Sequence, residues 1–277
     1  MRIQHNIMAM NANRNLTMNN SKLAKNLEKL SSGYRINRAG DDAAGLAISE
    51  SMRADIAIYD QSIKNANDGI SMVQTAEGAL TEVHDMLNRM ETLATQAANG
   101  TYDSGDKTKI QSEITALQGE ISRIATDTNF NGITLFTSGG ASASDVDFQV
   151  SEKSVITLGL ADVKLNADGL VTAATLDVTT ITDAAGWQAA LTGIKTDIDK
   201  VSEYRSNMGA IQNRLEHTVN NLGVTKENLQ NAESTIRDTN VADEMMAYTK
   251  NNILIQSAQA MLAQANQVPQ GVLQLMQ

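Results

Sequence analysis

Two separated stretches of this chain place apolar residues at steps that alternate between three and four, and this pattern constrains the fold most. The first stretch consists of Val73, Ala76, Leu80, Val83, Leu87, Met90, Ala94 and Ala97. The second consists of Tyr204, Met208, Ile211, Leu215, Thr218, Leu222, Thr225, Leu229, Ala232 and Ile236. Alternating steps of this kind form the apolar seam of a coiled coil. We therefore expect long helices from both halves of the chain to pack side by side.

A second apolar pattern follows the first seam after a short interruption. Residues 100 to 105 contain two glycines and break the pattern. The pattern then resumes at Ile110, Ile114, Leu117, Ile121 and Ile124. Two amphipathic segments joined by a short turn predict a helical hairpin, with the second helix running in the opposite direction.

The middle of the chain, about residues 131 to 186, has a different composition. It is rich in Thr, Val, Ser, Gly and Asp, which favour strands and turns. Residues 148–150 and 155–158 predict a β-hairpin joined by residues 151–154. The pairs Asn131-Gly132 and Asp168-Gly169 predict further turns. This segment is too short for more than a small β element.

The C-terminal segment, residues 251 to 277, contains no charged side chain. One seam runs through Leu254, Ala258, Met261, Ala265, Val268, Val272 and Leu275. Other apolar residues lie off this seam, so the segment has more than one apolar face. Pro269 is expected to kink or restart the helix, because proline lacks a backbone N–H.

The charge is distributed unevenly along the chain. The net charge is −10, yet residues 1 to 40 hold seven basic groups against Glu28 alone. No aromatic residues are interleaved with these basic groups, and no segment approaches the roughly 18 apolar residues of a membrane span. We therefore expect no nucleic-acid or membrane partner. A basic segment on an acidic body also suits contacts between copies of one chain.

Residues able to support catalysis are scattered. His5, His84 and His217 are isolated from one another in the sequence, and none belongs to a spacing typical of metal sites or hydrolases. The absence of Cys excludes disulfides and thiolate metal sites. The adjacent Asp41 and Asp42 are interpreted as a helix cap. We expect no enzyme activity, no metal and no cofactor.

Residues 30–49 read LSSGYRINRAGDDAAGLAIS and closely resemble the N-terminal signature of bacterial flagellins. The resemblance continues at residues 65–80 (NANDGISMVQTAEGAL), 129–132 (NFNG), 209–216 (GAIQNRLE) and 256–267 (QSAQAMLAQANQ). It implies a mainly α fold, with long coiled-coil helices from both chain ends forming a rod and a small β-hairpin element in the middle.

The resemblance also implies a division of the chain into five parts. These are an N-terminal inner-tube segment and spoke (1–44), N-terminal rod helices (45–135), a short variable β region (136–189), a C-terminal rod helix (190–237) and a C-terminal inner-tube helix (238–277). The middle faces outward in that family. Because burying several apolar faces takes several neighbours, we expect both chain ends to order only on assembly.

Membership of this family implies a structural subunit that polymerises into the flagellar filament, is exported by the type III apparatus and works outside the cell. Implied partners are copies of the chain, an export chaperone at the C-terminus, and the filament cap and hook-junction proteins. Candidate subunit contacts are Arg35, Arg38, Leu254, Met261, Val268, Val272 and Leu275. A hook-filament junction protein of the same fold and a generic coiled-coil adaptor are the alternatives.

The resemblance further implies recognition by Toll-like receptor 5 through the rod helices. Arg89, Leu93, Gln96 and, on the next helix, Glu113 match the receptor-contacting positions of the family. The surrounding residues depart from the usual pattern, notably at Asn88. A second interpretation is that Arg89 serves a contact between subunits.

Overall fold

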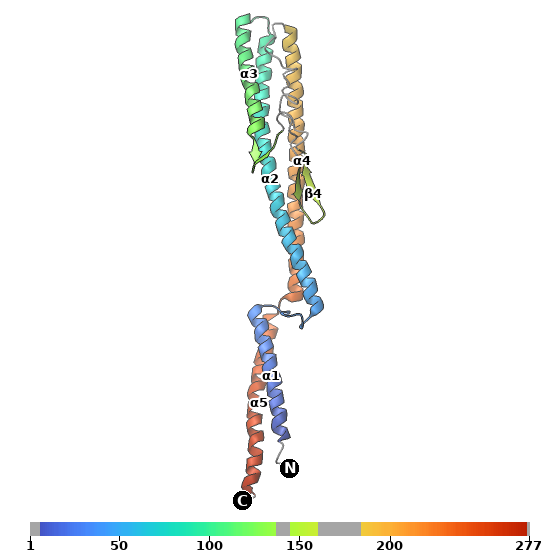
Figure 1. Ribbon diagram of the computed structural model, residues 1–277, viewed down its shortest axis with the longest axis vertical. Helices are drawn as coiled ribbons and strands as arrows, with labels where there is room; N and C mark the ends of the chain where they lie inside the picture. The colour runs from blue at the N-terminus through green and yellow to red at the C-terminus, as the bar shows by residue number, and fades with distance from the viewer. Residues whose placement is uncertain (1–5, 137–144, 160–183, 276–277) are drawn as a thin grey trace. The chain divides into compact units, whose positions relative to one another are not determined.

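The computed structural model describes residues 6–136, 145–159 and 184–275, and most of these residues are helical. The described helices are α1 (Ile7–Ser32), α2 (Ala43–Ala98), α3 (Ser104–Asp127), α4 (Ala184–Arg237) and α5 (Val241–Leu275). The described strands are β1 (Asn129–Phe130), β2 (Ile133–Thr134), β3 (Val146–Gln149) and β4 (Val155–Leu158), and they pair as two small antiparallel hairpins. The expected mainly α fold with a small β element is confirmed (Figure 1).

The chain divides into two compact units. The terminal unit comprises residues 1–56 and 227–277, and the central unit comprises residues 57–226. One boundary between the units lies within α2 and the other within α4, whereas the boundaries expected from the sequence lie near residues 44 and 237. The described part of α4 also begins at Ala184, before the expected boundary at 190. No proline occurs in either helix, so both helices can continue without interruption across the boundary between the two units.

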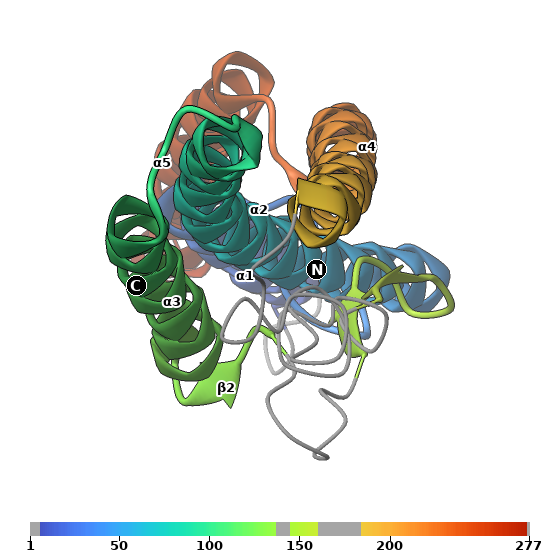
Figure 2. The same ribbon diagram turned by 90° about the horizontal axis from the view of Figure 1, so that it is seen from above.

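The central unit is built from three helices around an apolar core. Figure 2 shows this part of α2, together with α3 and α4, nearly end on. All eight predicted seam residues of α2 are fully buried, which confirms that seam. Facing residues from the other two helices complete the core, and the buried ones are Ile110, Ile114, Ile121, Ala125, Trp187, Ala190, Ile194, Val201, Met208, Leu215 and Leu222.

Ion pairs show that α2 and α4 run in opposite directions. Lys226 Nζ lies 2.6 Å from Asp60 Oδ1, and Arg205 Nη2 lies 3.7 Å from Glu77 Oε1. Residue numbers therefore fall along α4 as they rise along α2. Such partly exposed pairs contribute at most about 1 kcal/mol each. The buried seams therefore supply most of the stability of this unit.

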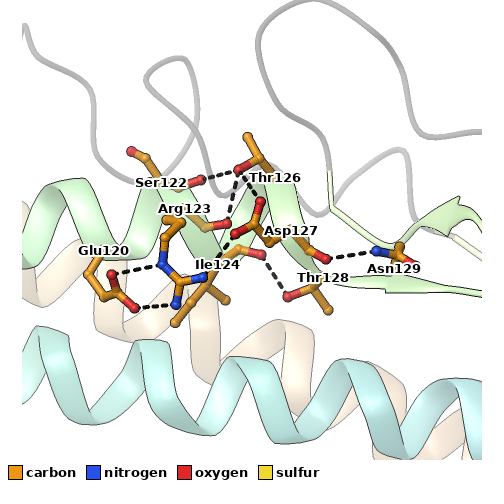
Figure 3. Close-up of polar contacts among 8 residues, drawn as sticks. All are labelled: Glu120, Ser122, Arg123, Ile124, Thr126, Asp127, Thr128 and Asn129. Atoms are coloured by element: carbon orange, nitrogen blue, oxygen red, sulfur yellow. Dashed lines mark hydrogen bonds and ion pairs between the residues drawn. The ribbon is translucent and has the colours of Figure 1, made fainter.

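Polar contacts define the C-terminal end of α3 (Figure 3). The backbone N–H and hydroxyl of Thr128 both donate to the carbonyl of Ile124, at 3.0 and 2.6 Å. Arg123 pairs with Glu120 and with Asp127 on the same helix, and its hydrogen bond lowers the pKa of Glu120. These contacts satisfy the last turn of the helix as the chain turns into β1.

The Asn131-Gly132 turn is confirmed. Both residues have positive φ angles, 51° and 82°, and β1 pairs with β2 so that Phe130 lies opposite Ile133. A two-residue turn with two positive φ angles matches the twist of a hairpin. The predicted Asp168-Gly169 turn lies outside the described residues.

The second predicted hairpin is also confirmed, with shifted bounds. Strand β3 begins at Val146 and ends at Gln149, so Val150 belongs to the loop, where its N–H donates to Ser154 O at 3.1 Å. Phe148 is buried, and a Cβ atom on Gly69 of α2 would lie 3.1 Å from its ring. The missing side chain at Gly69 therefore lets the hairpin lie directly on α2.

Helix α5 continues through Pro269 to Leu275, so the helix does not restart at this proline, and the other expected outcome, a kink, stays a prediction. A proline removes one N–H donor from a helix but does not necessarily end it, and here few residues follow. The terminal unit therefore contains two long helices, α1 and α5, which lie side by side (Figure 1).

Candidate functional site

Helices α1 and α5 pack against each other in an antiparallel arrangement. Asn6 caps the start of α1 by accepting from the N–H of Ala9, and its side-chain amide donates to Ala265 O of α5 at 2.7 Å. The seam on α1 consists of Ala9, Ala12, Leu16, Asn19, Leu23, Asn26 and Leu30, and the seam on α5 consists of Glu244, Tyr248, Asn251, Ile255, Ala258, Leu262 and Ala265. Steps of three and four alternate in both.

The seam on α5 differs from the predicted one. Ile255 is buried and Leu262 is half-buried, whereas Leu254 and Met261 are 40% and 62% exposed. The expectation that Leu254 and Met261 share the seam of Ala258 and Ala265 is therefore wrong. Both stripes contain Ala258 and Ala265, but Ile255 and Leu262 face α1 in place of Leu254 and Met261, each one residue further along and about 100° around the helix. Val268, Val272 and Leu275 lie on the part of α5 whose side chains fall outside the described set.

Asn26 is a buried polar residue in the α1 seam. With its amide nitrogen facing Glu244, Nδ2 donates to Glu244 Oε1 at 3.0 Å and to Lys22 O at 2.9 Å. In this orientation Oδ1 accepts from the backbone N–H of Tyr248 and from the side-chain amide of Asn251. A buried Asn with such partners selects one register of a coiled coil, because any slip leaves its amide unpaired.

Sequence reasoning missed this α1 seam, although a signal was present. Leu16, Leu23 and Leu30 repeat every seven residues, and Asn19 and Asn26 occupy the positions between them. A seam in which leucine alternates with asparagine is less apolar than the α2 seam. A pattern that requires an apolar residue at every seam position therefore does not reveal this seam.

Apolar side chains remain exposed on both helices of the terminal unit. A groove of about 580 Å³ runs between α1 and α5, and a second of about 510 Å³ lies along α5 alone. The first is lined by Met8, Asn11, Ala12, Asn15, Met18, Asn19, Lys22, Leu254, Ser257, Ala258 and Met261. The second is lined by Met245, Met246, Thr249, Lys250, Ile253 and Leu254. Together, these two grooves are named the open face.

Arg35 joins the two chain segments of the terminal unit. Its backbone N–H donates to Arg237 O at 2.6 Å, and its guanidinium donates to the carbonyl of Ile236. Arg237 in turn lies 4.7 Å from the ring centroid of Tyr34 and 2.7 Å from Glu50 Oε1. The hydrogen bond from Arg237 is the main reason why the pKa of Glu50 lies below its ordinary value. Arg35 therefore holds α4 to the segment that follows α1.

Arg38 lies in the same connecting segment and pairs within the chain. Its Nε lies 2.8 Å from Glu28 Oε1 of α1. Its backbone N–H donates to Asp41 Oδ2 at 3.2 Å, and this bond is the main cause of the lowered pKa of Asp41. The Arg38 side chain remains largely exposed and accessible to another molecule.

The predicted cap at Asp41-Asp42 is confirmed for Asp42. Its Oδ1 accepts from the N–H of Gly45 at 2.9 Å, at the first turn of α2. A Cβ atom on Gly45 would lie 2.4 Å from the Asp42 carboxylate and 2.9 Å from Ile36. The close approach therefore requires glycine at this position.

The predicted receptor residues do not all lie on the surface. Arg89 of α2 donates to Glu113 Oε1 of α3 through Nε and Nη2, at 3.0 and 2.8 Å, and both side chains are about half exposed. Gln96 is exposed and donates to the hydroxyl of Tyr102 at 3.0 Å. Leu93 is only 3% exposed and belongs to the core. It therefore offers a partner almost no surface.

Within the described residues, no group of three or more His, Asp or Glu side chains is arranged to hold a metal ion. No described helix combines the length and hydropathy that crossing a bilayer requires.

Comparisons with known proteins cover nearly the whole chain. Residues 3–140 match the family model described as the bacterial flagellin N-terminal helical region, and residues 191–276 match the bacterial flagellin C-terminal helical region. The chain is 49% identical to a flagellin from Bacillus subtilis over all of both chains, and 51% identical to one from Halalkalibacterium halodurans over 99% of each.

A solved structure shares the fold. It is that of a putative flagellar hook-associated protein from Vibrio parahaemolyticus, with a TM-score of 0.59 and 15% sequence identity. The match covers 72% of this chain and all of the other. At this identity the likeness concerns the fold alone.

Proposed function

This chain belongs to the bacterial flagellin family, and from this premise we propose that it polymerises through the open face of α1 and α5. Flagellins are structural subunits of the flagellar filament, not enzymes, and the chain is such a subunit. The proposal concerns which residues make the contacts.

One observation carries this proposal. The α2 seam of the central unit is fully buried within the chain, whereas Ile7, Met8, Met246, Ile253 and Met261 of the terminal unit are all more than half exposed. Exposed apolar patches of this kind usually mark interaction sites. Because flagellin polymerises, the occupant we assign to the open face is the same face of neighbouring copies.

The proposed contacts include residues on both grooves and beyond them. Leu254 lines both grooves and Met261 lines the one between α1 and α5. We also propose contacts for Val268, Val272 and Leu275 on the uncharged end of α5. Arg35 and Arg38 are proposed as contacts to an acidic neighbour, although both already have partners within the chain.

Charge substitutions on the open face test this proposal. We expect the double variant Leu254→Asp, Met261→Asp to raise the critical concentration for polymerisation at least about tenfold. Removing two carboxylates from water costs more than the lysines of the grooves, Lys22 and Lys250, can return. Sedimentation of filaments over a protein concentration series measures this.

The matched control is Leu254→Met, Met261→Leu, which keeps side-chain volume and apolar character and should assemble like the parent. Circular dichroism of the monomers checks that the charged variant keeps its helices. If the charged variant assembles at the parent's critical concentration, the open face is not an assembly surface.

The remaining alternative within this fold is a hook-filament junction protein. Identity of about half to proteins named flagellin, over essentially the full length, favours the filament subunit. The hook-associated neighbour shares the fold at 15% identity and does not favour the junction role. A generic adaptor has no reason to match both flagellin models.

We further propose that Arg89, Gln96 and Glu113 form the surface recognised by Toll-like receptor 5. The support is their exposure on neighbouring parts of α2 and α3. Arg89 and Glu113 hold each other in place, so the guanidinium is already oriented when a partner arrives. Leu93 acts from the core by packing under this surface.

Arg89→Ala is the sharpest test of this receptor surface. We expect it to weaken binding of the monomer to the receptor ectodomain about 10- to 100-fold, because arginines at interfaces are frequent hot spots. Arg123→Ala is the matched control, since Arg123 is also exposed and ion-paired on α3. Unchanged affinity in a direct binding assay for Arg89→Ala, together with impaired polymerisation, would assign Arg89 to filament packing.

Export and the accessory partners are proposed from family membership. We propose export through the flagellar type III apparatus to the outside of the cell, and assembly beneath a filament cap on hook-junction proteins. We also propose that an export chaperone binds the C-terminal part of α5. The supporting observation is the exposed apolar side chains on the described part of α5, among them Ile253, Leu254 and Met261, which need shielding before assembly.

A further inference from the structure

The exposed methionines of the described residues are concentrated in the terminal unit. Those on α1 are Met8, Met10 and Met18, and those on α5 are Met245, Met246 and Met261. Each of the six is between 48% and 66% exposed. In the central unit, Met72, Met90 and Met208 are at most 2% exposed, and Met86 is half-buried. A reagent that attacks thioethers from solution therefore reaches the six exposed side chains far more readily than the methionines of the core.

Most of these six residues line the open face. Met8, Met18 and Met261 line the groove between α1 and α5, and Met245 and Met246 line the groove along α5. We name the set of six the methionine surface. Thioethers are flexible and polarizable, so they adapt well to the apolar surface of another molecule.

We propose that the methionine surface is a redox-sensitive modification site, at which a peroxide converts thioethers to sulfoxides and so prevents assembly of the subunit. This rests on the proposed function, because it requires the open face to be the assembly surface. In the reaction the sulfur attacks one oxygen of hydrogen peroxide, the O–O bond breaks and an S–O bond forms. The sulfur loses two electrons, the peroxide is reduced by two, and water leaves.

The effect on assembly follows from the polarity of the product. A sulfoxide oxygen is a hydrogen-bond acceptor, and in the free subunit water or a nearby donor such as Lys22 satisfies it. A neighbouring copy displaces that water, and where its apolar side chains, such as Ile253 and Leu254, cover the sulfoxide, they supply no donor. Helix α1 or α5 itself tolerates the change, because these side chains point into solvent and not into the core.

The modification is reversible, because methionine sulfoxide reductases return the sulfoxide to the thioether. Assembled subunits should resist it, since neighbours cover the methionine surface. The site therefore acts on subunits before they enter the filament.

Peroxide treatment of the purified full-length monomer tests the proposal. After removal of hydrogen peroxide, assembly is started, filaments are sedimented, and sulfoxides are located by peptide mass spectrometry. We expect sulfoxide at the six positions to be at least about tenfold enriched in the unassembled fraction, with Met72, Met90 and Met208 unmodified. Treatment with methionine sulfoxide reductases should restore assembly.

Two variants separate the methionine surface from the core. Replacing all six exposed methionines by leucine keeps volume and removes the sulfur atoms of the methionine surface, so its assembly should be unaffected by peroxide. Replacing Met72, Met90 and Met208 by leucine should leave the parent's sensitivity unchanged. If the six-leucine variant assembles poorly before treatment, the fractionation of the parent protein decides the matter alone.

Equal sulfoxide content in assembled and unassembled fractions of the parent would overturn the proposal, as would a six-leucine variant that remains peroxide-sensitive. Failure of the proposed assembly surface has a different outcome. In that case the Leu254→Asp, Met261→Asp variant polymerises normally and the methionine surface is oxidised equally fast in filament and monomer.

Discussion

In the free monomer, amide protons of α1 and α5 are expected to exchange with solvent at least about a thousandfold faster than those of α2 around Leu80 and Leu87. The reason is the difference in burial. Among the described residues of the α1–α5 seam, only Asn26, Ile255 and Ala265 are buried, whereas the α2 seam is completely buried. In the structure the two chain ends pair as helices. Because we expect the chain ends to become ordered only on assembly, we predict that this helix pair opens easily outside the filament.

Polymerisation should remove most of this difference, because neighbours then cover the open face. Hydrogen exchange followed by mass spectrometry on monomer and filament measures it, with peptides of α2 from the central unit as the internal control. Equal protection of α1 and α5 in the two states would show that the chain ends fold by themselves. Assembly would then have to be explained without coupled folding.

The stability of the central unit is expected to fall by about 2 to 4 kcal/mol as the pH rises from about 4 to about 7, through one buried carboxyl group. Asp197 of α4 has a side chain that is only 8% exposed, and burial raises its pKa to about 7. Lys200 Nζ, 3.7 Å from Asp197 Oδ1, opposes this shift without cancelling it.

The sign follows from proton binding. The folded carboxyl binds a proton more tightly than the unfolded one, whose ordinary pKa is 3.8. Its stabilising contribution is therefore complete below about 4, declines as the pH rises, and is lost above about 7. Glu120 acts in the opposite direction, because its pKa is lowered, and it loses its contribution as the pH falls below its ordinary value of 4.5.

Urea unfolding of the parent and of Asp197→Asn, each at pH 5 and pH 8, measures this contribution. The amide does not titrate, so the stability difference between parent and variant should change by a few kcal/mol between the two pH values. Asp199→Asn is the matched control, because Asp199 is an exposed carboxylate on the same helix. A parent and an Asp197→Asn variant with parallel pH profiles would exclude Asp197 as the cause.

Much of the central unit could be predicted from sequence. The α2 seam, the Asn131-Gly132 turn and the β3–β4 hairpin follow from local patterns, because each depends on residues close together in the chain. Leu93 could not be placed in this way. It lies off the α2 seam but is buried, because α2 packs against α3 as well as α4 and needs a wider buried arc than a single partner requires.

The terminal unit shows the limit most clearly. The sequence by itself determined that α5 carries no charge from Asn251 onward and has several apolar faces, since spacing and composition are local properties. Only the tertiary structure decided that Ile255 faces α1 while Leu254 and Met261 remain open. A helix with apolar residues on several faces has no intrinsic preference for burying one of them. The contacts with α1 therefore determine which face is buried, here through Asn26 and Asn6.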